Sequence, residues 1–253
     1  TTKAEQTVEL DERLLAAPSM ALQRSSAVAG EMAECAVRAL KNSLTAFTAH
    51  TPELAQSIRD DEARCDHYED ILGTYLVRLS AQQMGADESE EATALLKSIG
   101  DLERISDHAV NVLSSAEELR SKGLSFSRDA VAEFDVLSAA INEILDLSLR
   151  CFTQRDVHIA AQVEPLEQVI DTLKERIRTR HILRMQQGAC SIEAGFVLSD
   201  LLTELERTSD HCSNIAGCVI DAAQHHLNLH ETQKATKTDS ADFQPAFARY
   251  ARK

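Results

Sequence analysis

A fourteen-residue motif that occurs twice constrains the fold of this chain more than any other sequence feature. Residues 101–114 read DLERISDHAVNVLS, and residues 204–217, which begin 103 positions later, read ELERTSDHCSNIAG. The two copies are identical at seven positions, which are Leu102/Leu205, Glu103/Glu206, Arg104/Arg207, Ser106/Ser209, Asp107/Asp210, His108/His211 and Asn111/Asn214. Self-similarity at a long, fixed spacing indicates internal duplication, so we expect two halves with the same fold.

Acidic and amide side chains recur every four residues within each copy of the motif. Glu103, Asp107 and Asn111 have this spacing, which places them on one stripe along an α-helix. Like charges four residues apart repel by about 0.2–0.5 kcal/mol in an isolated helix. Because the chain repeats the same repulsive pair in both halves, we predict a bound cation that offsets the repulsion.

The same acidic spacing occurs in an earlier segment of each half. Glu62 and Asp66 precede the first copy of the motif, and Glu167 and Asp171, 105 residues further on, precede the second. On a helical wheel these pairs flank the seam between neighbouring helices, so we expect them to converge with the motif pairs. The predicted metal ligands are Glu62, Asp66, Glu103, Asp107, Asn111, Glu167, Asp171, Glu206, Asp210 and Asn214.

The chemistry of these side chains limits the kind of cofactor. Oxygen ligands suit hard or borderline cations such as magnesium, manganese, calcium and iron, and a neighbouring histidine would admit zinc or nickel. We therefore expect divalent or trivalent metal ions, with iron, zinc and magnesium all open as candidates.

A metal-free explanation of the acidic pairs is also open. The chain has 41 acidic residues, so chance alone provides roughly six to seven acidic pairs at this spacing, usually on solvated helix faces. Arg104 and Arg207 each offer a charge that would neutralise a neighbouring carboxylate in a structural ion pair. His108 and His211 fall off the carboxylate stripe on the wheel, and we predict that they are polar surface residues.

The composition favours an all-α protein and excludes several functions. Glycine, proline and aromatic residues are scarce among the 253 residues, as is typical of helical bundles. The formal net charge of −15 argues against nucleic acid as a partner, because nucleic-acid-binding proteins carry a basic stripe. No apolar run approaches the length of a transmembrane helix. The six cysteines form no CxxC pair, so we expect reduced, buried thiols in a cytoplasmic protein.

Apolar residues at helical spacing divide the chain into six long helices, which predict two tandem three-helix bundles related by duplication. Residues 1–18 are expected to form an N-terminal arm, 19–124 the first bundle, 125–229 the second bundle and 230–253 a flexible tail.

Glycine and proline predict where some of these helices end or bend. Gly85 and Gly188 are expected to end the second and fifth helices. The fifth helix is expected to begin after Asp156 and to kink at Pro165, whose ring removes a backbone hydrogen bond.

The duplicated pattern [D/E]LER-SDH-x-x-N in an all-α chain resembles the PhoU family, over about residues 20–228. The N-terminal segment LDERLLAAPSMALQ also resembles the connection between the membrane part of bacterial sodium/phosphate cotransporters and their C-terminal PhoU-like domain. The resemblance implies metal ions or multinuclear clusters on the acidic motifs, with iron in some members. It also implies a role in restraining phosphate uptake.

Four functions follow from these patterns. The resemblance implies a metal-binding regulatory domain that controls phosphate uptake, at the cytoplasmic face of the inner membrane. Its partner would be the membrane domain of a sodium/phosphate cotransporter in the same polypeptide, with a homodimer as a further assembly. The alternative is a stand-alone PhoU-type regulator, which would signal to a sensor kinase and an ABC phosphate transporter.

The remaining two functions are a metal-free helical scaffold and a carboxylate-bridged di-iron enzyme. Such an enzyme needs Glu-x-x-His pairs that project into a bundle core. None of the nine histidines has a glutamate three residues before it. We therefore expect that the protein is not an enzyme.

Overall fold

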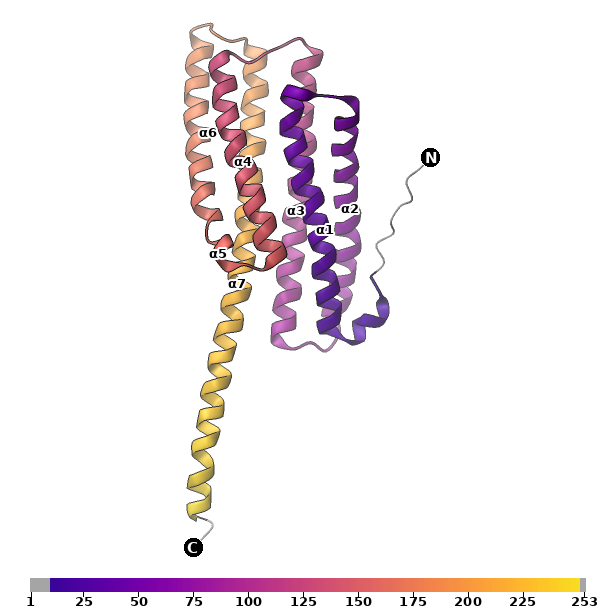
Figure 1. Ribbon diagram of the computed structural model, residues 1–253, viewed down its shortest axis with the longest axis vertical. Coiled ribbons are helices and arrows are strands. Elements are labelled where there is room, and N and C mark those ends of the chain that lie inside the picture. The colour runs from indigo at the N-terminus through magenta and orange to yellow at the C-terminus, as the bar shows by residue number, and fades with distance from the viewer. Residues whose placement is uncertain (1–9, 251–253) are drawn as a thin grey trace.

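The described chain consists almost entirely of helices, arranged as two bundles side by side (Figure 1). The computed structural model describes the backbone of residues 10–250 and the side chains of residues 10–225. The elements are η1 (Glu12–Ala16), α1 (Pro18–Ala49), α2 (Pro52–Ser80), α3 (Ala86–Ser121), α4 (Arg128–Gln154), α5 (Val157–Ala160), α6 (Val163–Gln186) and α7 (Ile192–Tyr250). Helices α1, α2 and α3 form the first bundle, and α4, α6 and α7 form the second. The predicted all-α fold of two three-helix bundles is confirmed.

Side chains that accept backbone hydrogen bonds mark where several helices begin. The Thr51 hydroxyl accepts a 3.0 Å hydrogen bond from the amide of Leu54, and Pro52 occupies the first position of α2. The Ser127 hydroxyl accepts a 3.2 Å hydrogen bond from the amide of Ala130 at the start of α4. Each cap satisfies an amide that has no partner within its helix, which stabilises the helix by about 1 kcal/mol.

The glycine that we expected to end the second helix begins the third helix instead. Helix α2 ends at Ser80, and Gly85 is the N-cap of α3 with an ordinary φ of −66°. Its amide donates a 3.0 Å hydrogen bond to the Glu88 carboxylate, which closes the first turn of α3. Gly188 does follow the end of α6, where its φ of +68° is a left-handed conformation that glycine adopts without strain. The prediction was wrong for Gly85 and is confirmed for Gly188.

The expectation of one kinked helix around Pro165 was also wrong, because the chain breaks there into two helices. The short helix α5 follows Asp156, whose carboxylate accepts hydrogen bonds from two amides of the first turn. Ala161 and Gln162 form a turn, and α6 then begins at Val163. Pro165 lies in the first turn of α6, where its missing amide hydrogen has no helical partner to lose.

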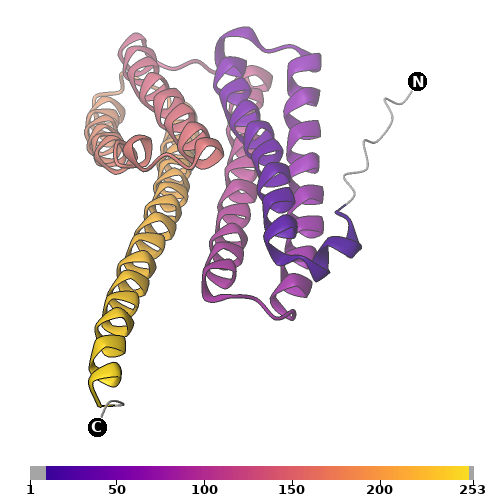
Figure 2. The same ribbon diagram turned by 60° about the horizontal axis from the view of Figure 1, so that its bottom comes forward.

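The C-terminal helix is longer than the sequence predicts. Helix α7 continues to Tyr250, so the expected flexible tail is helical as far as that residue. Beyond the bundles, α7 projects as a single helix away from the others (Figures 1 and 2). The apolar periodicity of the sequence stops near residue 229, but the helical backbone continues beyond it. Residues 1–9 of the predicted arm and residues 251–253 of the predicted tail lie outside the described part.

Small side chains line α1, which packs against helices of both bundles. This helix contacts α2 and α3 in its own bundle and α4 in the second. Fully buried alanines on α1 include Ala21, Ala29, Ala33, Ala36 and Ala39. Their size lets the neighbouring helices approach closely. The apolar residues thus serve to pack helix against helix, and none of the described helices is both long and apolar enough to cross a bilayer.

The six cysteines are free thiols. Four of them are buried among the core side chains, and these are Cys35, Cys65, Cys151 and Cys212. For these four, the predicted role of small core residues is confirmed. Cys190 and Cys218 are partly exposed.

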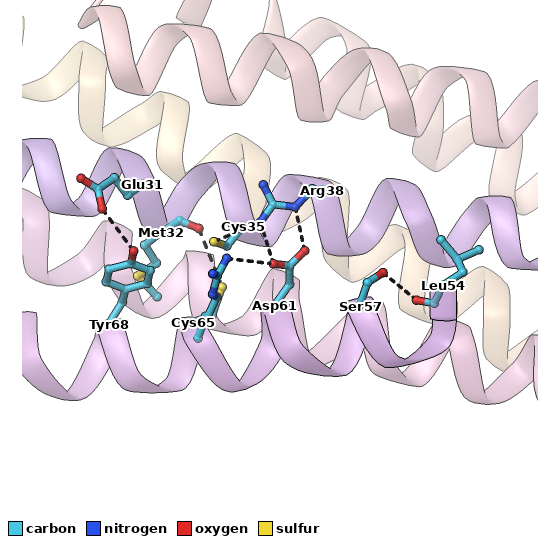
Figure 3. Close-up of polar contacts among 10 residues, drawn as sticks. Glu31, Met32, Cys35, Arg38, Leu54, Ser57, Asp61, Cys65 and Tyr68 are labelled. Carbon is cyan, nitrogen blue, oxygen red and sulfur yellow. Dashed lines mark hydrogen bonds and ion pairs between the residues drawn. The ribbon is translucent and has the colours of Figure 1, made fainter. Parts of the chain in front are cut away.

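A buried carboxylate on α2 is held by an arginine from α1, as Figure 3 shows. Asp61 is only 5% exposed, and its two oxygens accept hydrogen bonds of 2.6 and 2.9 Å from the Arg38 guanidinium. The Arg38 side chain is 48% exposed and therefore remains hydrated. Asp61 has lost its water, so this fork of two hydrogen bonds is its main compensation.

Replacing Arg38 by methionine is expected to lower the free energy of unfolding by about 2 kcal/mol, because a buried carboxylate loses its main partner. Arg64, 3.8 Å from Asp61, limits the loss. The double variant Arg38→Met with Asp61→Asn should recover part of it, since the buried charge is removed. Arg24→Met, at an exposed position of α1, is the control. Urea denaturation measures these differences, and equal stability of Arg38→Met and wild type would contradict the role of this ion pair.

Candidate metal centre

Three carboxylates from two helices meet at the seam between α2 and α3. Glu62 and Asp66 project from α2 and Asp107 from α3, and one oxygen of each lies within 4.8 Å of the others. The four-residue spacing puts Glu62 and Asp66 on one face of α2, and the packing of α3 brings Asp107 opposite them. Among the described side chains, this is the one group of three or more acidic, histidine or cysteine ligands.

Glu103 adds a fourth negative group to this seam, which we call the acidic seam. Burial, followed by the negative charge of Asp107, raises the pKa of Glu103 to about 7. Burial and the charges of Asp66 and Asp107 also raise the pKa of Glu62. Carboxylates that are close together and partly desolvated resist ionising at the same time. The acidic seam therefore carries more negative charge than the side chains around it neutralise.

Arg104 forms the ion pairs that the metal-free explanation requires, but they are weak. Its guanidinium lies 3.7 Å from Glu103 and 3.8 Å from Asp107, and its side chain is 65% exposed. Ion pairs at exposed positions contribute about 0–1 kcal/mol, because water screens both charges. Arg104 therefore offsets only part of the repulsion within the acidic seam.

The donor set of the acidic seam fits a hard or borderline metal ion. Carboxylate oxygens are the ligands that magnesium, calcium, manganese and iron take in proteins. Glu62, Asp66 and Asp107 are the residues that would hold the ion, with Glu103 beside them. A bound cation would allow all four groups to ionise together, which removes the conflict that raises their pKa values.

The corresponding carboxylates of the second half do not form such a group in the described structure. Glu206 instead contacts the ammonium of Lys174 at 2.5 Å. Burial, together with neighbouring carboxylates, raises the pKa of Glu167 and of Asp210. Asp171 is exposed to solvent, as is its equivalent Asp66. The clearest difference between the two halves is therefore the contact of Lys174 with Glu206.

The two asparagines of the predicted ligand set lie away from the carboxylates that they were expected to join. The Asn111 amide donates a 3.2 Å hydrogen bond to Glu204, and the Asn214 amide donates a 3.2 Å hydrogen bond to Asp101. Each of these bonds joins α3 of the first bundle to α7 of the second. The structure thus places both asparagines at the interface between the halves.

The prediction that His108 and His211 are surface residues was wrong, because they lie in this same interface. His108 Nδ1 is 2.5 Å from the Glu204 carboxylate, and His211 Nδ1 is 2.8 Å from that of Asp101. The two rings stack, with their centroids 5.4 Å apart. Burial lowers the pKa of His108, although the contact with Glu204 opposes this shift. The wheel separated the histidines from the carboxylate stripe, but it could not show that another helix covers their face.

The contacts across the interface obey the spacing of the duplicated motif. Asp101 and Glu204 occupy the same position in the two copies, as do the two histidines and the two asparagines. Each half therefore presents an acid, a histidine and an asparagine to the same three residues of the other. The one signal for this arrangement in the sequence is that each motif opens with an acidic residue.

Two helical bundles related by internal duplication, with acidic residues at equivalent positions, define a class of all-α proteins. The PhoU domain matches residues 29–116 and 135–219, one match within each bundle. These matches cover more than half of the chain, which therefore belongs to the PhoU family.

Two relatives illustrate the similarity in sequence. The chain is 27% identical over 126 residues to the phosphate-specific transport system accessory protein PhoU homolog 1 of Thermotoga maritima. That alignment covers 50% of this chain and 53% of the relative. It is also 27% identical over 182 residues to the phosphate-specific transport system accessory protein PhoU homolog of Pseudomonas putida. That alignment covers 72% of this chain and 70% of the relative.

Two solved structures share the fold. PhoU from Pseudomonas aeruginosa aligns with a TM-score of 0.68 and 23% identity, covering 84% of this chain and 98% of that chain. The phosphate transport system regulatory protein PhoU from Streptococcus pneumoniae aligns with a TM-score of 0.71 and 16% identity, and the alignment covers 81% of this chain and 96% of that one. At these identities the likeness concerns the fold.

The stability of the metal-free protein is expected to fall as the pH rises between the two pKa values of Glu103. The ordinary pKa of a glutamate side chain is 4.5, and burial with the charge of Asp107 raises the pKa of Glu103 to about 7. Between these values the folded state holds a proton that the unfolded chain has lost. The free energy of unfolding should therefore decrease across this window and then level off. Glu103→Gln should flatten the decline, whereas Glu90→Gln, at an exposed position of α3, should not. Urea denaturation at several pH values tests this, and parallel curves for wild type and Glu103→Gln would contradict it.

Proposed function

We propose that this chain is an accessory regulator of phosphate transport that holds metal ions at the acidic seam. The observation that carries the proposal is its membership of the PhoU family, with relatives named as accessory proteins of phosphate-specific transport systems. The acidic seam supports the metal-binding part, because its four carboxylates lack an adequate cation from the protein itself.

The proposed partner is a phosphate transporter in the membrane. The names of the relatives favour a separate transporter over a membrane domain in the same polypeptide, because they describe accessory proteins. They also favour regulation over catalysis. The free thiols of all six cysteines support a reducing, cytoplasmic location.

The proposed metal would act by joining α2 to α3. A cation at the acidic seam supplies positive charge that neutralises Glu62, Asp66, Glu103 and Asp107, and it favours the folded state by mass action. The residues of the chain do the rest: α2 presents one pair of carboxylates and α3 the other. Helix α3 also holds the second bundle through His108, so the metal-binding helix is the one that connects the two halves.

Metal should stabilise the wild-type protein against heat. At about a hundred times its dissociation constant, a bound ion adds about 2.7 kcal/mol, and a chelator should remove this gain. The double variant Glu62→Ala with Asp66→Ala should lose the response. Asp60→Ala with Asp70→Ala, which removes two exposed charges from the same helix, should keep it. Thermal melts with manganese(II) or a chelator measure the difference, and an unchanged melting temperature in wild type would refute metal binding at the acidic seam.

Loss of the protein should release phosphate uptake from control. Cells that lack the gene are expected to accumulate more radiolabelled phosphate from phosphate-rich medium than wild-type cells. The wild-type gene should restore control, and the variant Asp60→Ala with Asp70→Ala should do the same. Glu62→Ala with Asp66→Ala should restore it incompletely, provided that the variant protein is present at equal level. Uptake that does not depend on the gene would refute the regulatory role.

A further inference from the structure

The second half contains a buried lysine, and the described part of the first half does not. Lys174 on α6 is only 6% exposed. Its ammonium lies 2.5 Å from Glu206 and 3.3 Å from Glu175. A lysine is rarely buried to this extent unless it is paired, because the ammonium loses its water. These two carboxylates are the partners that make its burial tolerable.

The duplication shows which residue of the first half corresponds to this lysine. The spacing of 105 residues that relates Glu62 to Glu167 also relates Glu69 to Lys174. Glu206, the partner of the lysine, corresponds to Glu103 of the acidic seam. The position equivalent to Lys174 is therefore acidic in the first half, where Glu69 stands, and basic in the second.

Both carboxylates hold the ammonium of Lys174 in place. The 2.5 Å contact with Glu206 and the 3.3 Å contact with Glu175 give it two anionic partners inside the fold. In the first half, the guanidinium that lies beside Glu103 belongs to Arg104, which is 3.7 Å away and has a 65% exposed side chain.

We infer that Lys174 is a built-in cation that takes the place of a metal ion in the second half, so that the chain has one metal centre, at the acidic seam of the first half. This inference rests on the proposed metal binding at the acidic seam, and its rule is that the half with the buried lysine binds no metal ion. A metal ion that entered the second half would have to displace an ammonium tethered beside its ligand. A tethered group competes at a high effective concentration, whereas the metal must be drawn from solution.

The rule predicts that exchanging one residue adds or removes a metal site. Lys174→Glu gives the second half the residue of the first, and it removes the competing ammonium from Glu206. Glu69→Lys gives the first half the residue of the second, and it places an ammonium beside Glu103. Lys122→Glu makes the same charge change at an exposed position and serves as the control.

The experiment counts manganese(II) bound to each purified chain by elemental analysis after free metal has been removed. Relative to wild type, Lys174→Glu should bind about twice as much metal, Glu69→Lys should bind almost none and Lys122→Glu should bind the same amount. Adding Glu62→Ala and Asp66→Ala should abolish binding in the wild-type background but only halve it in Lys174→Glu.

Two other outcomes separate this inference from the proposal beneath it. If the wild-type chain keeps half of its manganese after Glu62→Ala and Asp66→Ala, then both halves bind metal and Lys174 does not exclude it. If neither wild type nor Lys174→Glu binds manganese, metal binding at the acidic seam fails, and the inference fails with it. Should Lys174→Glu not fold, Glu69→Lys still decides, because metal binding as strong as in wild type would overturn the rule.

Discussion

Repulsion between carboxylates held on facing helices is the constraint around which each half is organised. The four-residue spacing aligns acidic side chains along a helix, and the packing of two such helices brings the stripes together. Partial burial makes the repulsion worse, as the raised pKa values of Glu62 and Glu103 indicate. A fold that keeps such an arrangement must supply protons, a cationic side chain or a metal ion.

The two halves meet this requirement in different ways. In the second half, Lys174 supplies a charge from inside the structure. The first half has an exposed arginine at its margin, and its acidic seam fits an ion from solution. The second half would then need no cation from outside the protein, while the first half would depend on metal ions in solution.

Much of the architecture could be predicted from the sequence, because duplication and helical periodicity are local patterns that require no knowledge of packing. The two bundles and the convergence of Glu62 with Asp107 follow from such patterns. Helix ends are harder to predict, since one residue type can occupy more than one place: glycine is commonest just after a helix but also occurs at the N-cap, and proline fits a first turn although it breaks a helix interior. Gly85 and the break before Pro165 illustrate this ambiguity.

The rest could not be predicted because it depends on which faces meet. A helical wheel separates the faces of one helix but does not name the neighbour of each face. The wheel therefore predicts surface positions for His108 and His211, whereas the packing of α3 against α7 places both at an interface. The role of Lys174 was hidden for the same reason, because its partner Glu206 lies on another helix. Comparing equivalent positions of the duplication, Glu69 with Lys174, was the one signal available.

The paired contacts between α3 and α7 have a consequence for the origin of the chain. His108 meets Glu204 while His211 meets Asp101, so each surface is complementary to its own copy. Such an isologous arrangement is that of a two-fold symmetric homodimer. A single ancestral bundle with this surface would have dimerised through it, and fusion of two gene copies would have preserved the contact within one chain. Fusion also allows the two copies to differ, because a substitution in one half no longer appears in the other. The exchange of acid for lysine at one of two equivalent positions is a change that a homodimer of identical subunits cannot make.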